Sequence, residues 1–280
     1  MDELTQEILQ DAFDFHLHAS PDPYSEKSAD AIEVARQAKE LGMKGFVLKS
    51  HGFPTAPLAL VIKQFIPGIE VVGGLALNRE TGGLNPYAVE ISAKLGAKIL
   101  WMPTLSSLAA RQKKGLQDGI AIMDKDRRII PEMKEVLSLA GKYDLVVCTG
   151  HLVQEEIVAL FAEAKRMQIG KFVLTHPLQV AGTAVALKVQ KQLAEQGAFM
   201  EHCFLATMKG SRSIEPGKIV EAIRFVGAER CLLSTDFGNV RLPPPWEGMK
   251  EMLSTMLRHG LSREELSLMV KDNPSRLLGI

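Results

Sequence analysis

Eight short runs of apolar, mostly β-branched residues recur along the 280-residue chain, and amphipathic stretches separate them. Because successive positions in each run are apolar, both faces of each strand must be buried, which is typical of a parallel sheet. A repeat of about 25–35 residues fits successive β-α units, and about 250 residues is the usual size of a (β/α)8 barrel. The pattern therefore predicts the α/β class and a single (β/α)8 TIM barrel. The expected strands are residues 12–18, 45–49, 70–75, 98–102, 145–149, 171–175, 198–202 and 231–235.

No change in composition and no long polar linker divides the chain, so we expect one domain over residues 1–280. The connection 103–129 is long enough to predict a functional lid or a disordered segment, and 237–246 is a second, proline-rich loop. The C-terminal residues 262–280 read as a helical tail with a break before Pro274. The expected helices are residues 28–41, 55–65, 86–95, 131–141, 154–167, 183–196 and 216–226.

The charge balance narrows the classes of partner. Thirty-three basic and 33 acidic residues cancel, so the sequence has no electrostatic footprint for nucleic acid or an acidic membrane surface. No apolar run approaches the roughly 18 residues of a membrane span, and the acidic start of the chain lacks a signal-peptide pattern. Three cysteines inside apolar runs indicate buried thiols. We expect a cytoplasmic protein that acts on a small molecule, and the sequence leaves a homo-oligomer open.

Five of the seven histidines lie where these apolar runs end, and an aspartate ends the last run. Since the active site of a (β/α)8 barrel forms at the carboxyl ends of its strands, these side chains should meet there. Asp14, His16 and His18 have the same parity along their strand, so both histidines can point into the barrel mouth. Histidine and carboxylate ligands suit zinc, manganese, iron or nickel. The candidate ligands are His16, His18, His151, His176 and Asp236, although each histidine can also be an ordinary strand-end residue and Asp236 can cap a turn.

Further polar residues at strand ends are candidates for contacts with substrate. Lys49 has three readings: it binds an anionic group, it is carboxylated and bridges two metal ions, or it extends to solvent. His51 is expected to bind substrate or support a ligand rather than to be a primary ligand. Glu201 and His202 have opposite parity, so only one faces the mouth, and we expect His202. Arg111, in the long connection, is a candidate anion contact or a solvated loop residue.

This order of ligands along the strands resembles the amidohydrolase superfamily, and the resemblance covers essentially the whole chain. The ending Asp272-Asn273-Pro274-Ser275-Arg276-Leu277-Leu278-Gly279 is similar to one common in those hydrolases. The resemblance is to the compact, barrel-only branches, and most of all to an uncharacterised amidohydrolase-like group. It implies that His16, His18 and Asp236 hold one metal ion and that His151 and His176 hold a second.

One departure from the family pattern affects the number of metal ions. Two-metal members usually place a lysine or glutamate at the end of the fourth strand, where this chain has Met102-Pro103-Thr104. Lys49 on the second strand can substitute as the bridge. Otherwise the site holds a single ion, or two bridged by water alone.

The resemblance implies a metal-dependent hydrolase that activates water to cleave an amide, lactone or other ester bond of a small molecule. One or two divalent transition-metal ions would be the cofactor, zinc first among them, with manganese, iron and nickel as alternatives. Asp236 would be the general acid–base, and His202, Lys49 or Arg111 would stabilise developing negative charge. The alternatives are a metal-dependent decarboxylase or phosphoesterase on the same barrel, or a metal-binding barrel without catalysis.

Overall fold

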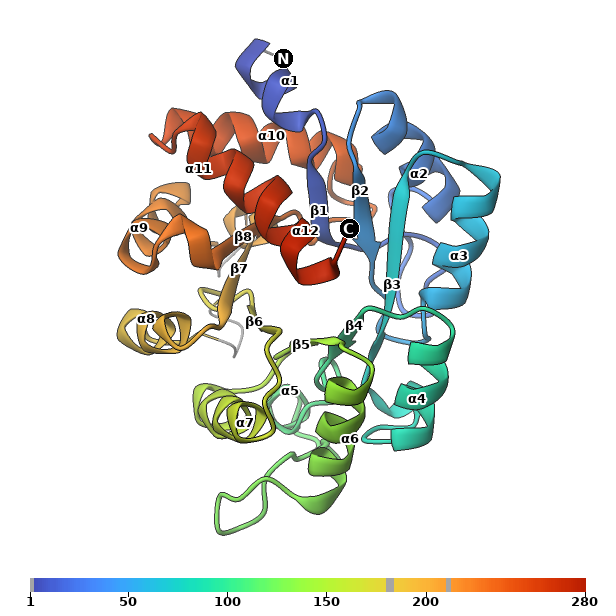
Figure 1. The fold of residues 1–280 in the computed structure, drawn as a ribbon, viewed down its shortest axis with the longest axis vertical. Coiled ribbons are helices and arrows are strands. Elements are labelled where there is room, and N and C mark those ends of the chain that lie inside the picture. The colour runs from blue at the N-terminus through green and yellow to red at the C-terminus, as the bar shows by residue number, and fades with distance from the viewer. Residues whose placement is uncertain (1–2, 180–183, 210–212) are drawn as a thin grey trace.

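The centre of the molecule is one sheet of eight parallel strands, each paired with the next along the chain (Figure 1). The computed structural model describes residues 3–179, 184–209 and 213–280. The sheet curls into a nearly closed barrel with the helices outside it, so the predicted (β/α)8 fold is confirmed. The strands are β1 (Phe13–Leu17), β2 (Gly45–Leu48), β3 (Glu70–Ala76), β4 (Ile99–Trp101), β5 (Val146–Cys148), β6 (Phe172–Thr175), β7 (Phe199–Cys203) and β8 (Cys231–Ser234).

The helices of the barrel lie close to their expected positions, and several begin at a cap that the sequence supplies. Asp30 accepts a hydrogen bond from the Glu33 amide at the start of α2, and Asn85 caps α4 in the same way. The expected helix 183–196 is shorter than predicted, and its residue 183 lies outside the described residues. The helices are α1 (Glu3–Leu9), α2 (Ala31–Glu40), α3 (Ala56–Phe65), α4 (Pro86–Lys94), α5 (Leu108–Gln112), α6 (Pro131–Lys142), α7 (Gln154–Arg166), α8 (Leu187–Glu195), α9 (Pro216–Val226), α10 (Pro245–Arg258), α11 (Arg263–Ser267) and α12 (Asn273–Leu278).

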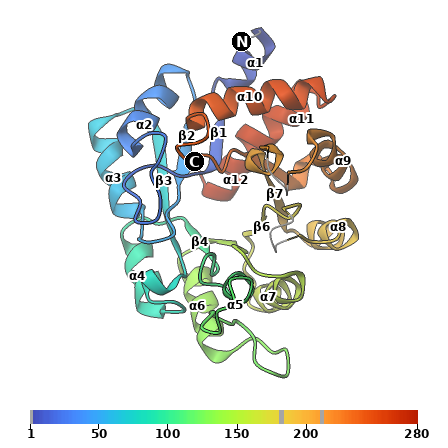
Figure 2. The same ribbon diagram turned by 180° about the vertical axis from the view of Figure 1, so that it is seen from behind.

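Two apolar layers hold the fold together. The larger fills the space between the strands and the surrounding helices. The smaller fills the barrel, with Phe13, Phe15 and Trp101 among its buried side chains. Leu277 and Leu278 of α12 join this inner cluster, because the tail crosses the end of the barrel where the strands begin (Figures 1 and 2). The opposite end, where the strands finish, is therefore the end left for polar groups.

The tail and the long connection both differ from expectation. The break expected before Pro274 is a π-helical turn, Leu268–Asp272, which joins α11 to α12. The connection 103–129 is neither helical throughout nor disordered. It contains α5 and is fastened by backbone bridges, Ser107 to Ile120 and Met123 to Ile129. Leu105 reaches the cavity described below, so this connection forms part of the wall of the site.

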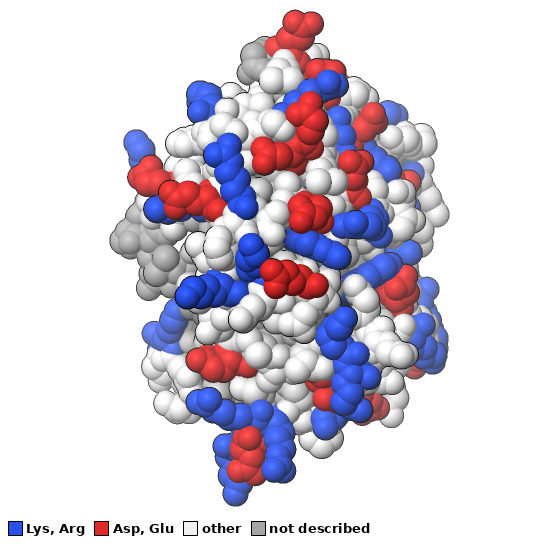
Figure 3. Space-filling model, turned by 60° about the vertical axis from the view of Figure 1, so that its left-hand side comes forward, with Lys and Arg blue, Asp and Glu red and all other residues white. Residues whose placement is uncertain are grey.

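Acidic and basic side chains alternate over the molecular face in Figure 3, in keeping with the zero net charge. Within the part of the chain that the structure describes, none of the helices has both the length and the apolar character of a membrane span.

Candidate metal centre

An irregularity in β1 aims the two histidines of the His-x-His pair. Phe13 and Asp14 pair with Gly45 and Phe46 of β2, but the next aligned residue is Leu17, opposite Leu48. From Asp14 to Leu17 the chain advances three residues, whereas β2 advances only two. The additional residue in β1 makes a β-bulge. The bulge changes the parity of the strand, so that His16 and His18 turn toward the barrel axis. The expectation that Asp14 lies on the same face as the histidines is wrong.

Asp14 instead fills the gap where β1 meets β8. Its Oδ1 accepts hydrogen bonds from the backbone N–H of His16 (3.2 Å) and Thr235 (3.0 Å), and its Oδ2 accepts from the Thr235 hydroxyl (2.5 Å). Burial raises the pKa of Asp14 to about 6, although these hydrogen bonds favour the charged form. The Asp236 N–H donates to the His16 carbonyl at 2.7 Å. The carboxyl group therefore helps to join the last strand to the first.

Three atoms that can ligate a metal ion converge at the end of the barrel where the strands finish. Asp236 Oδ1 lies 3.1 Å from His16 Nε2 and 3.3 Å from His18 Nε2, and all three side chains are largely buried. Asp236 follows β8 in a left-handed backbone conformation (φ 54°), which an L-residue adopts only at a cost. One donor atom from each of these three residues lies within 4.8 Å of the others, close enough to share one metal ion.

Glu201 of β7 fixes the orientation of the first histidine. Its Oε1 lies 3.2 Å from His16 Nδ1 and accepts a further hydrogen bond from the Ser234 hydroxyl (2.9 Å). With the Nδ1 proton directed at this carboxylate, Nε2 is the ring nitrogen that faces the centre. Carboxylate–histidine pairs of this kind orient the ligands of metal sites.

The electrostatics of the centre favour a cation. Burial lowers the pKa of His16, but attraction to Asp236 and Glu201 outweighs both burial and repulsion from Lys49, and the pKa rises to about 9. Without an ion the ring therefore carries a second proton, which a bound metal ion would displace. Burial also opposes ionisation of Asp236, yet His16 and His18 hold its pKa well below the usual range. For His18 burial outweighs the attraction to Asp236 and lowers the pKa to about 4. A carboxylate and two ring nitrogens that face one point form a donor set that zinc and similar ions accept.

Lys49 extends into the same point from the end of β2. Its Nζ lies 3.0 Å from His16 Nε2 and 5.4 Å from the centre of the Trp101 ring, and the residue is 2% exposed. The reading in which Lys49 extends to solvent is therefore wrong. Its ammonium group therefore lies beside the ring nitrogen that a metal ion would need. A bound ion thus requires Lys49 to move or to change its charge.

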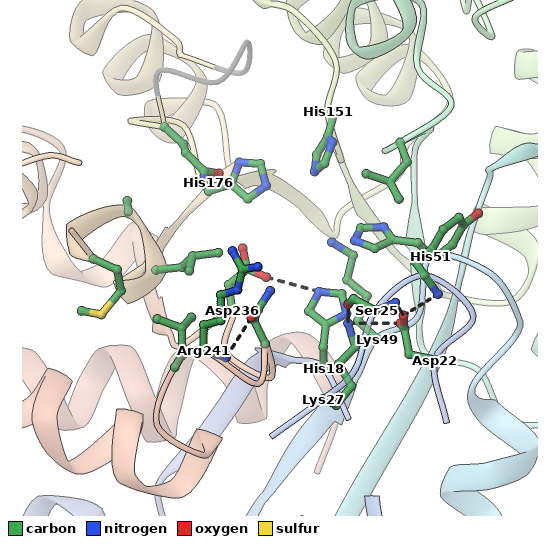
Figure 4. Close-up of a pocket in the computed structure, with 18 of the residues that line it drawn as sticks. His18, Asp22, Ser25, Lys27, Lys49, His51, His151, His176, Asp236 and Arg241 are labelled. Atoms are coloured by element: carbon green, nitrogen blue, oxygen red, sulfur yellow. Dashed lines mark hydrogen bonds and ion pairs between the residues drawn. The ribbon is translucent and has the colours of Figure 1, made fainter. Parts of the chain in front are cut away.

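The two later histidines face this centre from β5 and β6 (Figure 4). The rings of His151 and His176 are 5.2 Å apart, and the His176 ring lies 6.4 Å from that of His16. Burial lowers the pKa of His176 to about 4 and that of His151 well below its ordinary value, so both rings are neutral, as metal ligation requires. Neither belongs to the three-residue group that surrounds Asp236, so they lie where a second ion or a substrate would bind.

His51 is held by a network that sequence reasoning missed. The buried Asn78 side chain accepts from the backbone N–H of Thr104 (2.9 Å) and Ser106 (3.1 Å), and donates to the Thr104 hydroxyl (2.6 Å) and the His51 carbonyl (3.0 Å). Thr104 Oγ1 lies 2.8 Å from His51 Nδ1. Of the two described partners of this hydroxyl, Asn78 Nδ2 can only donate and His51 Nδ1 can accept, so we assign the hydroxyl proton to Nδ1 and the proton of His51 to Nε2. His51 is thereby a hydrogen-bond donor toward the cavity, in keeping with the expected contact with substrate.

The expected orientation of the Glu201–His202 pair is reversed. Side chains alternate along β7, and Glu201 faces the barrel with Phe199, so His202 faces the outer layer of the fold. Neither ring nitrogen of His202 has a hydrogen-bond partner among the described residues, and burial lowers its pKa to about 4. The sequence alone does not fix which side chains at the end of a strand face the barrel. Either alternate set can point inward until the neighbouring strands are placed.

Arg111 does not reach the centre. Its guanidinium forms a two-pronged ion pair with Asp118, through Nε to Oδ1 (2.8 Å) and Nη2 to Oδ2 (2.8 Å). A second arginine, Arg79, binds the same carboxylate. Of the two readings of Arg111, anion contact or loop residue, the structure supports the loop residue, because Arg111 is outside the described cavity lining and its guanidinium is paired with Asp118.

Most of the expected site residues line one cavity of about 730 Å³ at the carboxyl ends of the strands (Figure 4). His16 lies beneath its floor and is fully buried. Residues that the sequence did not single out complete the wall, and Tyr24 lies against His51 with ring centres 6.4 Å apart. The expected residues on the wall are His18, Lys49, His51, His151, His176 and Asp236.

Comparison with known proteins supports the fold and leaves the chemistry open. The model of a family of unknown function, DUF6282, matches residues 11–201. No curated protein sequence matches the chain. Solved structures with the same fold include an amidohydrolase from Pseudomonas aeruginosa, 14% identical over 99% of this chain and 97% of that one (TM-score 0.66).

Two further structures of similar fold are also named as hydrolytic enzymes. The probable dipeptidase PvdM from Pseudomonas aeruginosa is 10% identical over 98% of this chain and 96% of that one (TM-score 0.68). A probable 2-pyrone-4,6-dicarboxylic acid hydrolase from Acinetobacter baumannii is 12% identical over 97% and 100% (TM-score 0.65). At these identities the likeness concerns the fold, and at that level the resemblance to amidohydrolases is confirmed.

Proposed function

The chain belongs to the DUF6282 family of unknown function, and we propose that it is a metal-dependent hydrolase of small molecules. The observation that carries this proposal is the convergence of His16 Nε2, His18 Nε2 and Asp236 Oδ1 on one buried point at the floor of the cavity. The fold it shares with an amidohydrolase, a probable dipeptidase and a probable dicarboxylic acid hydrolase supports the same chemistry.

His16, His18 and Asp236 would hold a divalent ion, zinc first and manganese, iron or nickel as alternatives. When bound, such an ion supplies Lewis-acid chemistry, polarising a carbonyl or phosphoryl oxygen and acidifying water. His151 and His176 are placed to bind a second ion or the substrate. With two ions, a carboxylated Lys49 would be the bridge. As an ammonium, Lys49 would instead face an anionic substrate group.

The protein's own groups would then handle the protons. The carboxylate of Asp236 stays ionised because His16 and His18 lower its pKa, so it can take a proton from the attacking water and deliver it to the leaving group. The Nε2–H of His51 would hold the carbonyl oxygen of an amide, lactone or ester. Without its negative charge, Asp236 could not serve as this base.

Removing that charge tests the proposal. Asp236→Asn should retain part of the metal, since the amide oxygen still ligates, but lose hydrolysis of a panel of lactones, aryl esters and dipeptides by about 10²–10⁴-fold. Hydrolysis that survives the change would remove Asp236 from the mechanism. Turnover of aromatic carboxylic acids or phosphate esters alone would favour the decarboxylase or phosphoesterase alternative. Metal binding with no turnover of any class would favour a non-catalytic barrel.

We further propose a cytoplasmic location. Three unpaired, buried cysteines, Cys148, Cys203 and Cys231, suit a reducing compartment. Fractionation of the native cells would test it.

A further inference from the structure

Two loops beside the cavity form a short antiparallel ribbon. Lys27, between β1 and α2, pairs with Asn239, between β8 and α10. The Ser28 N–H donates to the Gly238 carbonyl (2.9 Å), and the Val240 N–H donates to the Glu26 carbonyl (3.3 Å). Ser25 lies in a bend just before this bridge, and Arg241 lies in the turn that follows it, closed by the Leu242 N–H and the Asn239 carbonyl (2.9 Å). All four of these side chains line the cavity: Ser25, Lys27, Asn239 and Arg241.

The first loop of the ribbon, which carries Ser25 and Lys27, presents hydrogen-bond donors. Lys27 Nζ donates to Ser25 Oγ (2.8 Å) and lies 3.3 Å from Asp22 Oδ2. The other Asp22 oxygen accepts from the backbone N–H of Tyr24 (2.9 Å) and Ser25 (3.0 Å). Both carboxylate oxygens are therefore engaged. Since the Ser25 hydroxyl accepts from Lys27, its own proton remains to be donated.

The second loop, which carries Asn239 and Arg241, adds donors of its own. Asn239 Oδ1 accepts from the Arg241 backbone N–H (3.0 Å), so the side-chain nitrogen is the atom left for a ligand. Arg241 contributes a guanidinium, a rigid fork of N–H donors that matches a carboxylate. On this ribbon face, lysine, serine, asparagine and arginine all offer protons. A ligand group made only of acceptors fits it best.

The charges along the wall agree with this chemistry. Four lysine and arginine side chains carry positive charge on the described lining, and two carboxylates carry negative charge. The cations are Lys27, Lys49, Lys209 and Arg241, and the carboxylates are Asp22 and Asp236. Asp22 is engaged by Lys27, and Asp236 is engaged by His16 and His18. The cavity therefore has an excess of positive charge.

We propose that the substrate is an anion whose carboxylate binds this ribbon, with Arg241 as the main contact and Ser25 and Asn239 as further donors. The inference rests on the proposed function, because it places the scissile amide, lactone or ester at the His16–His18–Asp236 centre and the carboxylate away from it. A primary amide in place of the carboxylate brings its own N–H groups against a face of donors. Such a mismatch in a site built for one hydrogen-bonding pattern discriminates strongly.

The test compares two five-carbon probes, glutarate and its monoamide glutaramate, by calorimetry on Zn²⁺-treated protein. Each probe has one carboxylate for the metal centre, and only glutarate has a second for the ribbon. Wild type should bind glutarate at least about tenfold more tightly, the scale of one charge-assisted hydrogen bond. Arg241→Met should lose most of the preference, since only the Ser25 and Asn239 donors remain, whereas Arg241→Lys should keep a larger part of it. The matched control is Arg166→Met on α7, which removes an exposed arginine paired with Glu163 outside the cavity.

Equal binding of the two probes by wild type, or a preference that is undiminished in Arg241→Met, would overturn the carboxylate site. Tighter binding of 4-phosphonobutyrate than of glutarate, with the advantage lost in Arg241→Met, would overturn the choice of carboxylate. Zn²⁺ content, measured on the same samples, tests the proposed function separately. Normal Zn²⁺ content without a preference for glutarate would sink only the ribbon site, and a preference without Zn²⁺ would sink only the metal centre.

Discussion

Replacing Glu201 by glutamine removes one charge from the support of His16 and keeps the shape of the side chain. In the structure the carboxylate is buried, lies 3.2 Å from His16 Nδ1 and is held by Ser234 at 2.9 Å. A hydrogen bond to a charged group contributes about 1.5–3 kcal/mol, and such partners typically change metal affinity by about 10–100-fold. We therefore expect Glu201→Gln to weaken Zn²⁺ binding by about 10–100-fold and leave the fold intact.

The assay is competition for Zn²⁺ with a chromophoric chelator, with unfolding followed on the same samples. The matched control is His202→Gln, one residue along β7 and on the opposite face, which should leave Zn²⁺ affinity unchanged. Unchanged affinity in Glu201→Gln would refute the claim that this carboxylate orients the ligand. A larger loss of Zn²⁺ affinity in His202→Gln than in Glu201→Gln would refute the assignment of Glu201 to the inner face of β7.

Three further changes test other parts of the site. Lys49→Met should tighten Zn²⁺ binding in the same competition assay, because it removes an ammonium 3.0 Å from a ligand atom; a loss of metal would show instead that a carboxylated Lys49 bridges two ions. Thr104→Val should release His51 from its Nε2–H form, seen as a change in the ¹⁵N shifts of the ring, while Thr104→Ser keeps it; shifts that stay the same in Thr104→Val would contradict the assigned tautomer. The pKa of His202 falls from 6.5 to about 4 on folding, so its neutral burial contributes stability above pH 6.5 that is lost as pH falls toward 4. The free energy of unfolding should therefore fall less between pH 7 and pH 4 in His202→Leu than in wild type, by up to about 3 kcal/mol. Urea unfolding at the two pH values measures this difference, and an equal fall in wild type and His202→Leu would exclude this role.

Much of the fold follows from the sequence because burial on both faces leaves a continuous apolar run at every strand. Each of the eight expected strands overlaps an observed one, and the polar residues at their ends meet in one cavity. What a strand alone does not specify is which way its last side chains point. The bulge in β1 depends on how Leu17 aligns with Leu48, and the facing of Glu201 depends on His16 and Ser234.

The remaining parts of the site come from loops, where no periodicity restricts the prediction. Arg111 is a candidate because it is basic and lies in a long connection, but its guanidinium pairs with Asp118, seven residues later, and does not line the cavity. Arg241 reaches the cavity only because its loop pairs with the loop that carries Lys27. Asn78 has no sequence signal beyond its place after β3, since its role depends on backbone groups from two other segments.

The most direct test of the metal centre is the metal content of protein purified without added metal and then equilibrated with Zn²⁺. Wild type should retain one or two equivalents after gel filtration, and the double variant His16→Ala/His18→Ala should retain fewer, because it loses both ring nitrogens that face Asp236. Equal metal content in the two proteins, or none in wild type, would contradict the centre proposed here.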